Sequence, residues 1–201
     1  MILGIDLSLT STGLAIWRDR KLELDTIHTP DLRGKQRWAA ICGRIWGLVG
    51  EGAKEGGGPL VVLEGPVLAA NSGVDTVFDM AGLRGVLEYS LWSWATVSMV
   101  VPPSNLKKYA TGNGRASKEE VVKHVDRWVQ RYEHVPEPDD NDQADALVLT
   151  AMALDQYDSP LVDVPQLNRS ALSAGKNPLI WPVWSNPDPV VRRAEQSEVP
   201  F

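Results

Sequence analysis

The stretch DDNDQADALVLTAMAL, at residues 139–154, decides how the rest of the chain must fold. Its acidic residues crowd the first turn of a predicted helix, where carboxylates complement the positive end of the helix dipole. The later turns are almost entirely apolar, so the helix must run into a core. Asp142 and Asp145 are three residues apart and therefore project from one face of this helix.

Two like charges at the edge of a core repel each other and lose hydration, and a divalent cation is the usual remedy. The helix therefore predicts further carboxylates beside it. Two candidates follow short apolar runs: Asp6 ends the run at residues 2–6, and Glu64 follows the run at residues 60–63. Each is predicted at the end of a strand, where rigid backbone holds a side chain that still reaches solvent. A role for Asp6 in capping the next turn is the alternative.

The bulk composition is that of a globular protein, with 201 residues of which 43% are apolar, enough for one domain and a tail. No run of about 18 apolar residues is present, and the start of the chain does not resemble a signal peptide. The single cysteine, Cys42, rules out an internal disulfide framework and a cysteine-based zinc site. We therefore expect a cytoplasmic protein without a membrane partner.

The charges are segregated along the chain, although the net charge of −6 argues against a generally basic nucleic-acid binder. Residues 104–131 hold seven basic and three acidic side chains, whereas residues 132–168 hold nine acids and neither Lys nor Arg. This pattern fits a site that binds a polyanion and holds metal to cut it. A solvated helix face followed by an acidic loop is the alternative interpretation.

Hydrophobic periodicity predicts an α/β order of elements. The predicted strands lie at residues 2–6, 12–17, 21–28, 60–63 and 95–101, and the predicted helices at 32–54, 74–94, 104–110, 117–132 and 140–155. The second helix carries one side made of Val74, Phe78, Ala81, Gly85 and Tyr89. Glycines inside a helix lower its stability, so Gly82 and Gly85 predict close backbone packing against the sheet or a second subunit.

Residues 158–201 differ in composition from the rest of the chain. Seven prolines interrupt every candidate element there, and Trp181 and Trp184 are the obvious apolar anchors. We expect an extended or partly disordered tail, pinned to the body by its tryptophans. The predicted domain comprises residues 1–157.

The order of elements, with acids after the first and fourth strands and on the last helix, resembles the ribonuclease H-like layout of a mixed five-stranded sheet flanked by helices. Over about residues 1–155 the chain resembles the RuvC family of Holliday junction resolvases. The segments that carry this resemblance are residues 2–6, 12–13, 63–64, 83–86, 106–118 and 142–147.

The resemblance implies a structure-selective endodeoxyribonuclease that hydrolyses four-way (Holliday) and other branched DNA junctions as a homodimer. It implies Asp6, Glu64, Asp142 and Asp145 as catalytic ligands of two Mg²⁺ ions, for which Mn²⁺ substitutes. Four carboxylates suit hard divalent cations, and two such ions can supply an activated water and a stabilised leaving oxygen.

The resemblance also assigns basic residues to the substrate. Lys107 and Lys118 occupy the positions of two lysines of the family, and we expect them to meet the charge of the scissile phosphate. Lys108, Arg115 and Arg84 are further candidates for contacts with DNA, with ordinary surface charge as the alternative for Lys108 and Arg115.

Two other functions stay open on the sequence. The hairpin containing Gly4 and Gly13 could cradle a nucleotide phosphate in a phosphotransferase, but such kinases need two domains of this type. A protein that binds junctions without cutting them is the second alternative. The four acids argue against it, because a binder gains nothing from carboxylates that face phosphates.

Overall fold

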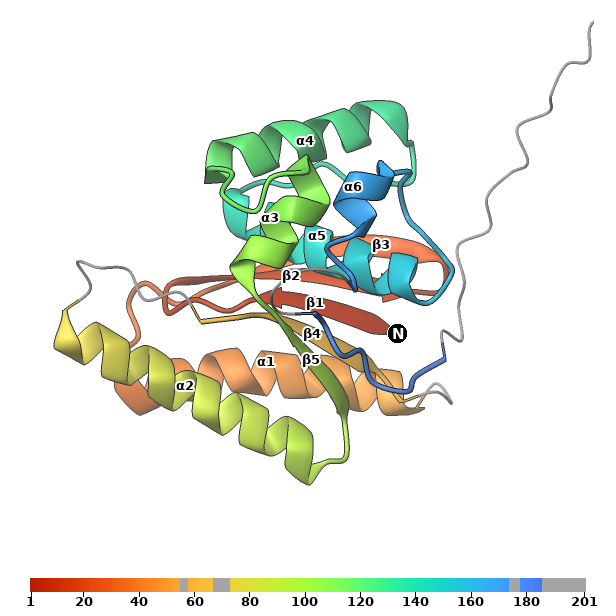
Figure 1. Cartoon of the computed structure of the whole chain (residues 1–201). Helices are drawn as coiled ribbons and strands as arrows, with labels where there is room; N and C mark the ends of the chain where they lie inside the picture. The colour runs from red at the N-terminus through yellow and green to blue at the C-terminus, as the bar shows by residue number, and fades with distance from the viewer. Residues whose placement is uncertain (55–57, 67–72, 174–177, 186–201) are drawn as a thin grey trace, which may run out of the picture.

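The computed structural model describes residues 1–54, 58–66, 73–173 and 178–185, and its centre is one sheet with helices on both faces (Figure 1). The strands are β1 (Ile2–Asp6), β2 (Ser11–Arg18), β3 (Lys21–His28), β4 (Leu60–Glu64) and β5 (Val97–Val101). They lie in the order β3-β2-β1-β4-β5, antiparallel from β3 to β1 and parallel from β1 to β5. The predicted mixed five-stranded sheet is confirmed.

The helices of the described part are α1 (Gly34–Lys54), α2 (Val74–Ser93), α3 (Pro103–Thr111), α4 (Lys118–Arg131), α5 (Asn141–Gln156) and α6 (Gln166–Arg169). Helices α1 and α2 cover one face of the sheet, and α5 covers the other beneath α3, α4 and α6 (Figure 1). The five predicted helices form within about two residues of their expected ends. None of the helices described is both long and apolar enough to cross a bilayer.

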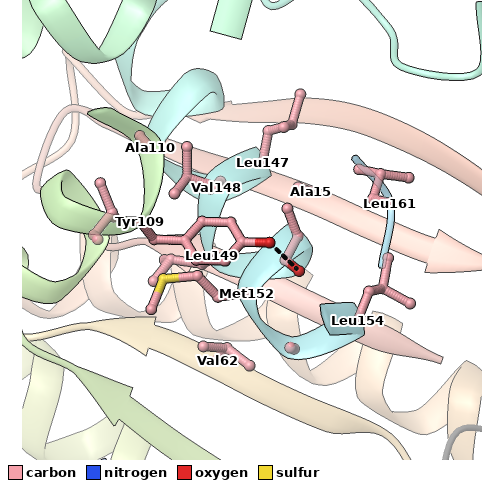
Figure 2. Close-up of a cluster of buried hydrophobic side chains, with 14 of the residues drawn as sticks. Ala15, Val62, Tyr109, Ala110, Leu147, Val148, Leu149, Met152, Leu154 and Leu161 are labelled. Atoms are coloured by element: carbon pink, nitrogen blue, oxygen red, sulfur yellow. Dashed lines mark hydrogen bonds between the residues drawn. The ribbon is translucent and has the colours of Figure 1, made fainter. Parts of the chain in front are cut away.

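Helix α5 lies at the centre of the core on its side of the sheet. All of its residues from Gln143 to Asp155 are buried, as the apolar run predicts. Figure 2 shows Tyr109 of α3 pointing into this cluster beside Leu149 and Met152 of α5, with Val62 of β4 beneath them. The core therefore extends from the sheet through α5 to the outer helices.

Helix α2 buries a different side from the stripe that the sequence singles out. Leu83, Leu87 and Leu91 are spaced by four residues. They are fully buried in a second hydrophobic core, which lies between the sheet, α1 and α2. Val74, Phe78 and Tyr89 are instead largely exposed, at 69%, 72% and 67%. Because α2 carries apolar residues on both sides, its periodicity does not determine which side faces the sheet.

The two glycines of α2 also differ from each other. A Cβ added at Gly82 would overlap the ring of Trp38 on α1, so this glycine does allow close packing, although against a helix rather than the sheet. At Gly85 the space beside the backbone is open. Only Gly82 therefore has a packing reason within the described chain.

The segment after α5 packs more closely than its prolines suggest. Leu161, Val162 and Leu172 are buried in the core, and α6 begins directly after Pro165. The predicted anchors are confirmed by contacts with the body: Trp184 Nε1 donates to the Gly58 carbonyl at 2.8 Å, and the Trp181 ring packs edge-on against Tyr157 with centroids 6.1 Å apart. Trp181 Nε1 also donates to the Leu172 carbonyl of its own segment at 3.1 Å. Apolar residues between the prolines provide this packing, and the division at residue 157 stays a prediction. Residues 174–177 and 186–201 of the expected tail lie outside the described residues.

Candidate active site

Asp6 and Glu64 end two neighbouring parallel strands. Strands β1 and β4 pair in register from Ile2 opposite Leu60 to Ile5 opposite Leu63, so their carboxyl ends reach the same edge of the sheet. Asp6 is buried and Glu64 is half-buried. The strand ends therefore bring together two acids that are 58 residues apart in the chain.

Two glycines allow α5 to lie directly on the strands beside this edge. A Cβ added at Gly13 of β2 would overlap the main-chain carbonyl of Asp142. One added at Gly4 of β1 would overlap the carbonyl of Ala146 and the hydroxyl of Thr150. The glycines thus serve close approach of helix and sheet. Helix α5 therefore covers the part of the hairpin that a phosphotransferase would need for binding a nucleotide phosphate.

The first turn of α5 is fixed by hydrogen bonds that the sequence analysis does not identify. Asp140 is the N-cap, and its carboxylate accepts from the Gln143 amide at 2.8 Å. The buried Gln143 side chain accepts from the Asp139 amide at 2.8 Å and donates to Thr26 Oγ1 of β3 at 2.9 Å. An Asp with Gln three residues later is close to a capping-box pattern, so a signal for this role was present.

Asp6, Glu64 and Asp145 form one carboxylate cluster, with oxygens that all lie within 4.8 Å of one another. Burial, followed by the charges of Glu64 and Asp145, raises the pKa of Asp6 to about 9. Burial, followed by the charge of Glu64, raises the pKa of Asp145 to about 7. Burial also raises the pKa of Glu64. Without a cation, the cluster therefore retains protons near neutral pH.

Asp142 and the two predicted lysines complete the surroundings of this cluster. Lys118 Nζ lies 3.8 Å from Asp142 Oδ1 and 3.8 Å from Asp145 Oδ2. Burial acts to lower the pKa of Lys118, but the surrounding carboxylates outweigh it and raise that pKa. The pKa values of Glu64 and Asp145 are raised by burial, and the charge of Lys107 on α3 acts against this rise in both. Both lysines thus partly compensate the acids.

A cleft of about 680 Å³ opens beside the cluster. All six residues predicted to be catalytic line it, and so does Arg84: Asp6, Glu64, Arg84, Lys107, Lys118, Asp142 and Asp145. The Lys108 and Arg115 side chains, both in the described part, are not in this lining. The structure therefore separates them from the other candidates.

Arg84, expected to contact DNA, is engaged within the protein. Its Nη1 donates to the main-chain carbonyl of Glu64 at 2.8 Å, and its Nε lies 2.6 Å from Glu88 Oε1. The contact with the Glu64 backbone shows that Arg84 supports the strand end that carries this acid. A further role toward DNA stays a prediction.

The donor set of the cluster fits a hard divalent cation. Three carboxylates from three separate elements converge, and oxygen ligands are those that Mg²⁺ and similar ions prefer. Their raised pKa values have the same origin, because buried acids that repel one another either hold protons or bind a cation.

Comparisons with known proteins agree with this geometry. No curated protein matches the sequence. Two solved structures of Thermus thermophilus RuvC, one described as a complex with Holliday junction substrate, are similar to this chain with TM-scores of 0.55 and 20% identity. Each match covers 74% of this chain and 88% or 90% of the other, which supports the ribonuclease H-like fold. The family model described as crossover junction endodeoxyribonuclease RuvC matches residues 2–153. The chain therefore belongs to the RuvC family of crossover junction endodeoxyribonucleases.

Proposed function

We propose that this junction-resolving nuclease hydrolyses DNA at the cleft lined by Asp6, Glu64, Asp142 and Asp145. The observation that carries the proposal is the convergence of Asp6, Glu64 and Asp145 within 4.8 Å at the wall of an open cleft. Burying several acids without a binding partner costs free energy, and packing of the hydrophobic core does not require acids at this position. Binding of cations and a polyanion explains both the acids and the lysines around them.

We assign the four acids as ligands of two Mg²⁺ ions, with Mn²⁺ as a substitute. Bound there, the cations would lower the pKa of a water molecule and offset charge on the leaving oxygen of the phosphodiester. The charges of Glu64 and Asp145 both act on Asp6, so its carboxylate would contribute a ligand oxygen to the same cations as these two acids. Asp142 is not part of the three-acid cluster, and its side chain is 23% exposed beside it.

Lys107 and Lys118 are assigned to the phosphates of the substrate. Lys118 is 54% exposed, so it reaches the cleft while remaining within 3.8 Å of two carboxylates. Two amines that line the same cleft can both contact a phosphate there and stabilise the charge that develops during hydrolysis. Lys108 and Arg115 are assigned to the DNA backbone beyond the cleft.

The expected homodimer has a candidate interface on α2. Its outward side carries Phe78, Tyr89 and Trp92, exposed at 72%, 67% and 75%. Exposed aromatic residues gathered on one side of a helix are typical of protein interfaces. A second copy on this side would pair two clefts, and two clefts suit a junction in which two strands are cut.

The test of the dimer is the substitution Phe78→Glu. We expect sedimentation to show a dimer for the wild type and a monomer for the variant, which would nick one strand instead of cutting in pairs. Leu167→Glu is the control, because Leu167 is 63% exposed on α6, away from α2. A wild type that sediments as a monomer would exclude this interface.

The test of the reaction is cleavage of a synthetic four-way junction, a three-way fork and a linear duplex with Mg²⁺, Mn²⁺ or a chelator. We expect cutting of branched DNA in the presence of either metal, and none with the chelator. Cutting that persists with the chelator would exclude the assigned chemistry. Binding of the four-way junction without cutting on any substrate would favour the non-catalytic alternative.

A further inference from the structure

The segment that follows α5 packs against the helix that carries Lys107. This segment, residues 158–172, lies beyond the 2–153 stretch matched by the family model. Helix α3 places Pro103 and Lys107 in the wall of the cleft. Contacts between the segment and α3 therefore bear on a site residue, although none of the segment lines the cleft.

Two hydrogen bonds fix α3, one near each of its ends. At its start, Asn105 Nδ2 donates to the Ala171 carbonyl at 2.9 Å. At its end, Asn168 Nδ2 donates to the Tyr109 carbonyl at 2.8 Å, and Asn168 is buried. Carbonyls in the last turn of a helix lack partners within the helix, so Asn168 acts as a cap supplied from another segment. The turn after α3 fits closely too, because a Cβ at Gly112 would lie 3.2 Å from Asn168 Oδ1.

A buried carboxylate joins the same segment to α5. Asp155 near the end of α5 accepts from Tyr109 Oη at 3.0 Å, and Arg169 Nη2 lies 2.7 Å from its other oxygen. The Asp155 side chain is only 1% exposed. The Arg169 side chain is 45% exposed, so the pair is partly buried, and loss of Arg169 leaves the buried carboxylate with one cationic partner fewer. Asp155 therefore holds α3, α5 and α6 in one arrangement.

These contacts connect the two sides of the active site. Helix α5 carries Asp142 and Asp145 at one end and Asp155 at the other, while α3 carries Lys107. We propose that Asn168 and Arg169 are positioning residues, which hold α3 so that Lys107 faces the carboxylate cluster. The inference rests on the proposed role of Lys107 toward phosphate.

The test combines Asn168→Ala and Arg169→Ala with Lys107→Ala. In the otherwise wild-type chain we expect each to lower the single-turnover rate on a four-way junction about tenfold, since small displacements of a positioned group cost that much or more. In the Lys107→Ala background the same substitutions should change the rate little. Arg169→Lys should restore part of the rate, and Arg44→Ala is the matched control, because it breaks a surface ion pair with Asp25.

A second measurement does not require cutting. The logarithm of the junction affinity falls with the logarithm of salt concentration in proportion to the phosphates neutralised. We expect the charge-neutral Asn168→Ala to reduce this slope as Lys107→Ala does, by about one, with no further loss in the double variant.

Unfolding curves define a temperature at which every variant is folded for these assays. Equal losses of rate in both Lys107 backgrounds, or an unchanged salt slope, would show that the segment acts only on stability and would overturn the proposal. If the wild type cuts no junction at all, the proposed function fails instead, and the salt slope still tests the positioning of Lys107.

Discussion

The two faces of the sheet are covered in different ways. On one face, α5 approaches so closely that Gly4 and Gly13 contact its backbone, and Thr150 Oγ1 donates to the Ala15 carbonyl at 3.0 Å. On the other face, leucine side chains of α2, such as Leu87, fill the space toward the sheet and α1. The α5 face fixes Asp142 and Asp145, whereas the α1–α2 face contributes mainly buried area, with Arg84 as its contact to the Glu64 strand end. The α5 side of the sheet thus mainly determines the positions of the acids, and the α1–α2 side mainly contributes to the free energy of unfolding.

The largest expected effect comes from opening the contact on the α5 face with Gly13→Ala. The added methyl group must displace the start of α5 and with it both Asp142 and Asp145. Since misplacing one such group can cost about a hundredfold, we expect cleavage to fall by roughly ten-thousandfold. The free energy of unfolding should drop by about 1–3 kcal/mol, as for other overpacked sites. Cleavage of a four-way junction and denaturant unfolding are the measurements.

Gly47→Ala on α1 is the matched control for this change. It lies at an exposed helical position with open space beside it, so we expect about 0.5–1 kcal/mol of added stability and unchanged cleavage. Normal cleavage by Gly13→Ala would contradict the role of the close contact.

The next largest effect is expected from Asp145→Asn, which keeps the shape of the cluster but removes a charge. Loss of a ligand worth several kcal/mol should lower cleavage on the order of a thousandfold, while junction binding persists or strengthens. Cleavage rates and binding in the presence of Mg²⁺ are compared with those of Asp139→Asn, which changes an exposed acid beside the same helix. Equal rates for the two variants would refute the assignment of Asp145.

Leu87→Ala tests the opposite face. The leucine is fully buried, so its truncation should lower the free energy of unfolding by about 2–5 kcal/mol. The cleavage rate per folded molecule should remain that of the wild type, because Leu87 does not line the cleft. A loss of cleavage in fully folded Leu87→Ala protein would show that the two faces are not independent.

The last expected effect concerns the pH dependence of stability without metal. The raised pKa values of Asp6 and Asp145 mean that the folded state holds protons that the unfolded state has released. Their contribution to stability is therefore present at acidic pH and is lost as pH rises through about 7 and then about 9. Mg²⁺ competes with these protons, so the stabilisation it gives should increase over the same range.

Thermal unfolding at several pH values, with and without Mg²⁺, measures this dependence. Asp145→Asn should remove the part near pH 7, whereas Leu87→Ala should preserve it. Stabilisation by Mg²⁺ that does not change with pH would contradict the binding of cations at the cluster.

Much of the fold could be predicted because local patterns and tertiary contacts agree. The apolar runs before Asp6 and Glu64 are strands, and the acidic start of α5 matches its capped end. The spacing of Asp142 and Asp145 placed both at the cleft. These features depend only on the spacing of apolar and acidic residues and on their order along the chain, and both can be read from the sequence.

Other features depend on contacts between distant segments and could not be read in the same way. The sequence does not reveal which side of α2 is buried, because both sides carry apolar residues. It likewise does not show that Arg84 bonds to the Glu64 backbone, or that Asn168 caps α3. A long polar side chain has the same appearance in a sequence whether its partner is solvent, DNA or a main-chain carbonyl.

The glycine contacts beneath α5 set a condition for transplanting this chemistry into another scaffold. Where the main chain of α5 contacts the main chain of a strand, no side chain can change its rotamer to relieve a clash. The separation between helix and strand is therefore fixed by the backbone atoms themselves. A grafting effort that copied only the ionisable side chains would leave them on a helix standing farther from its sheet. A transplanted site would therefore need Gly4 and Gly13 as well as the acids.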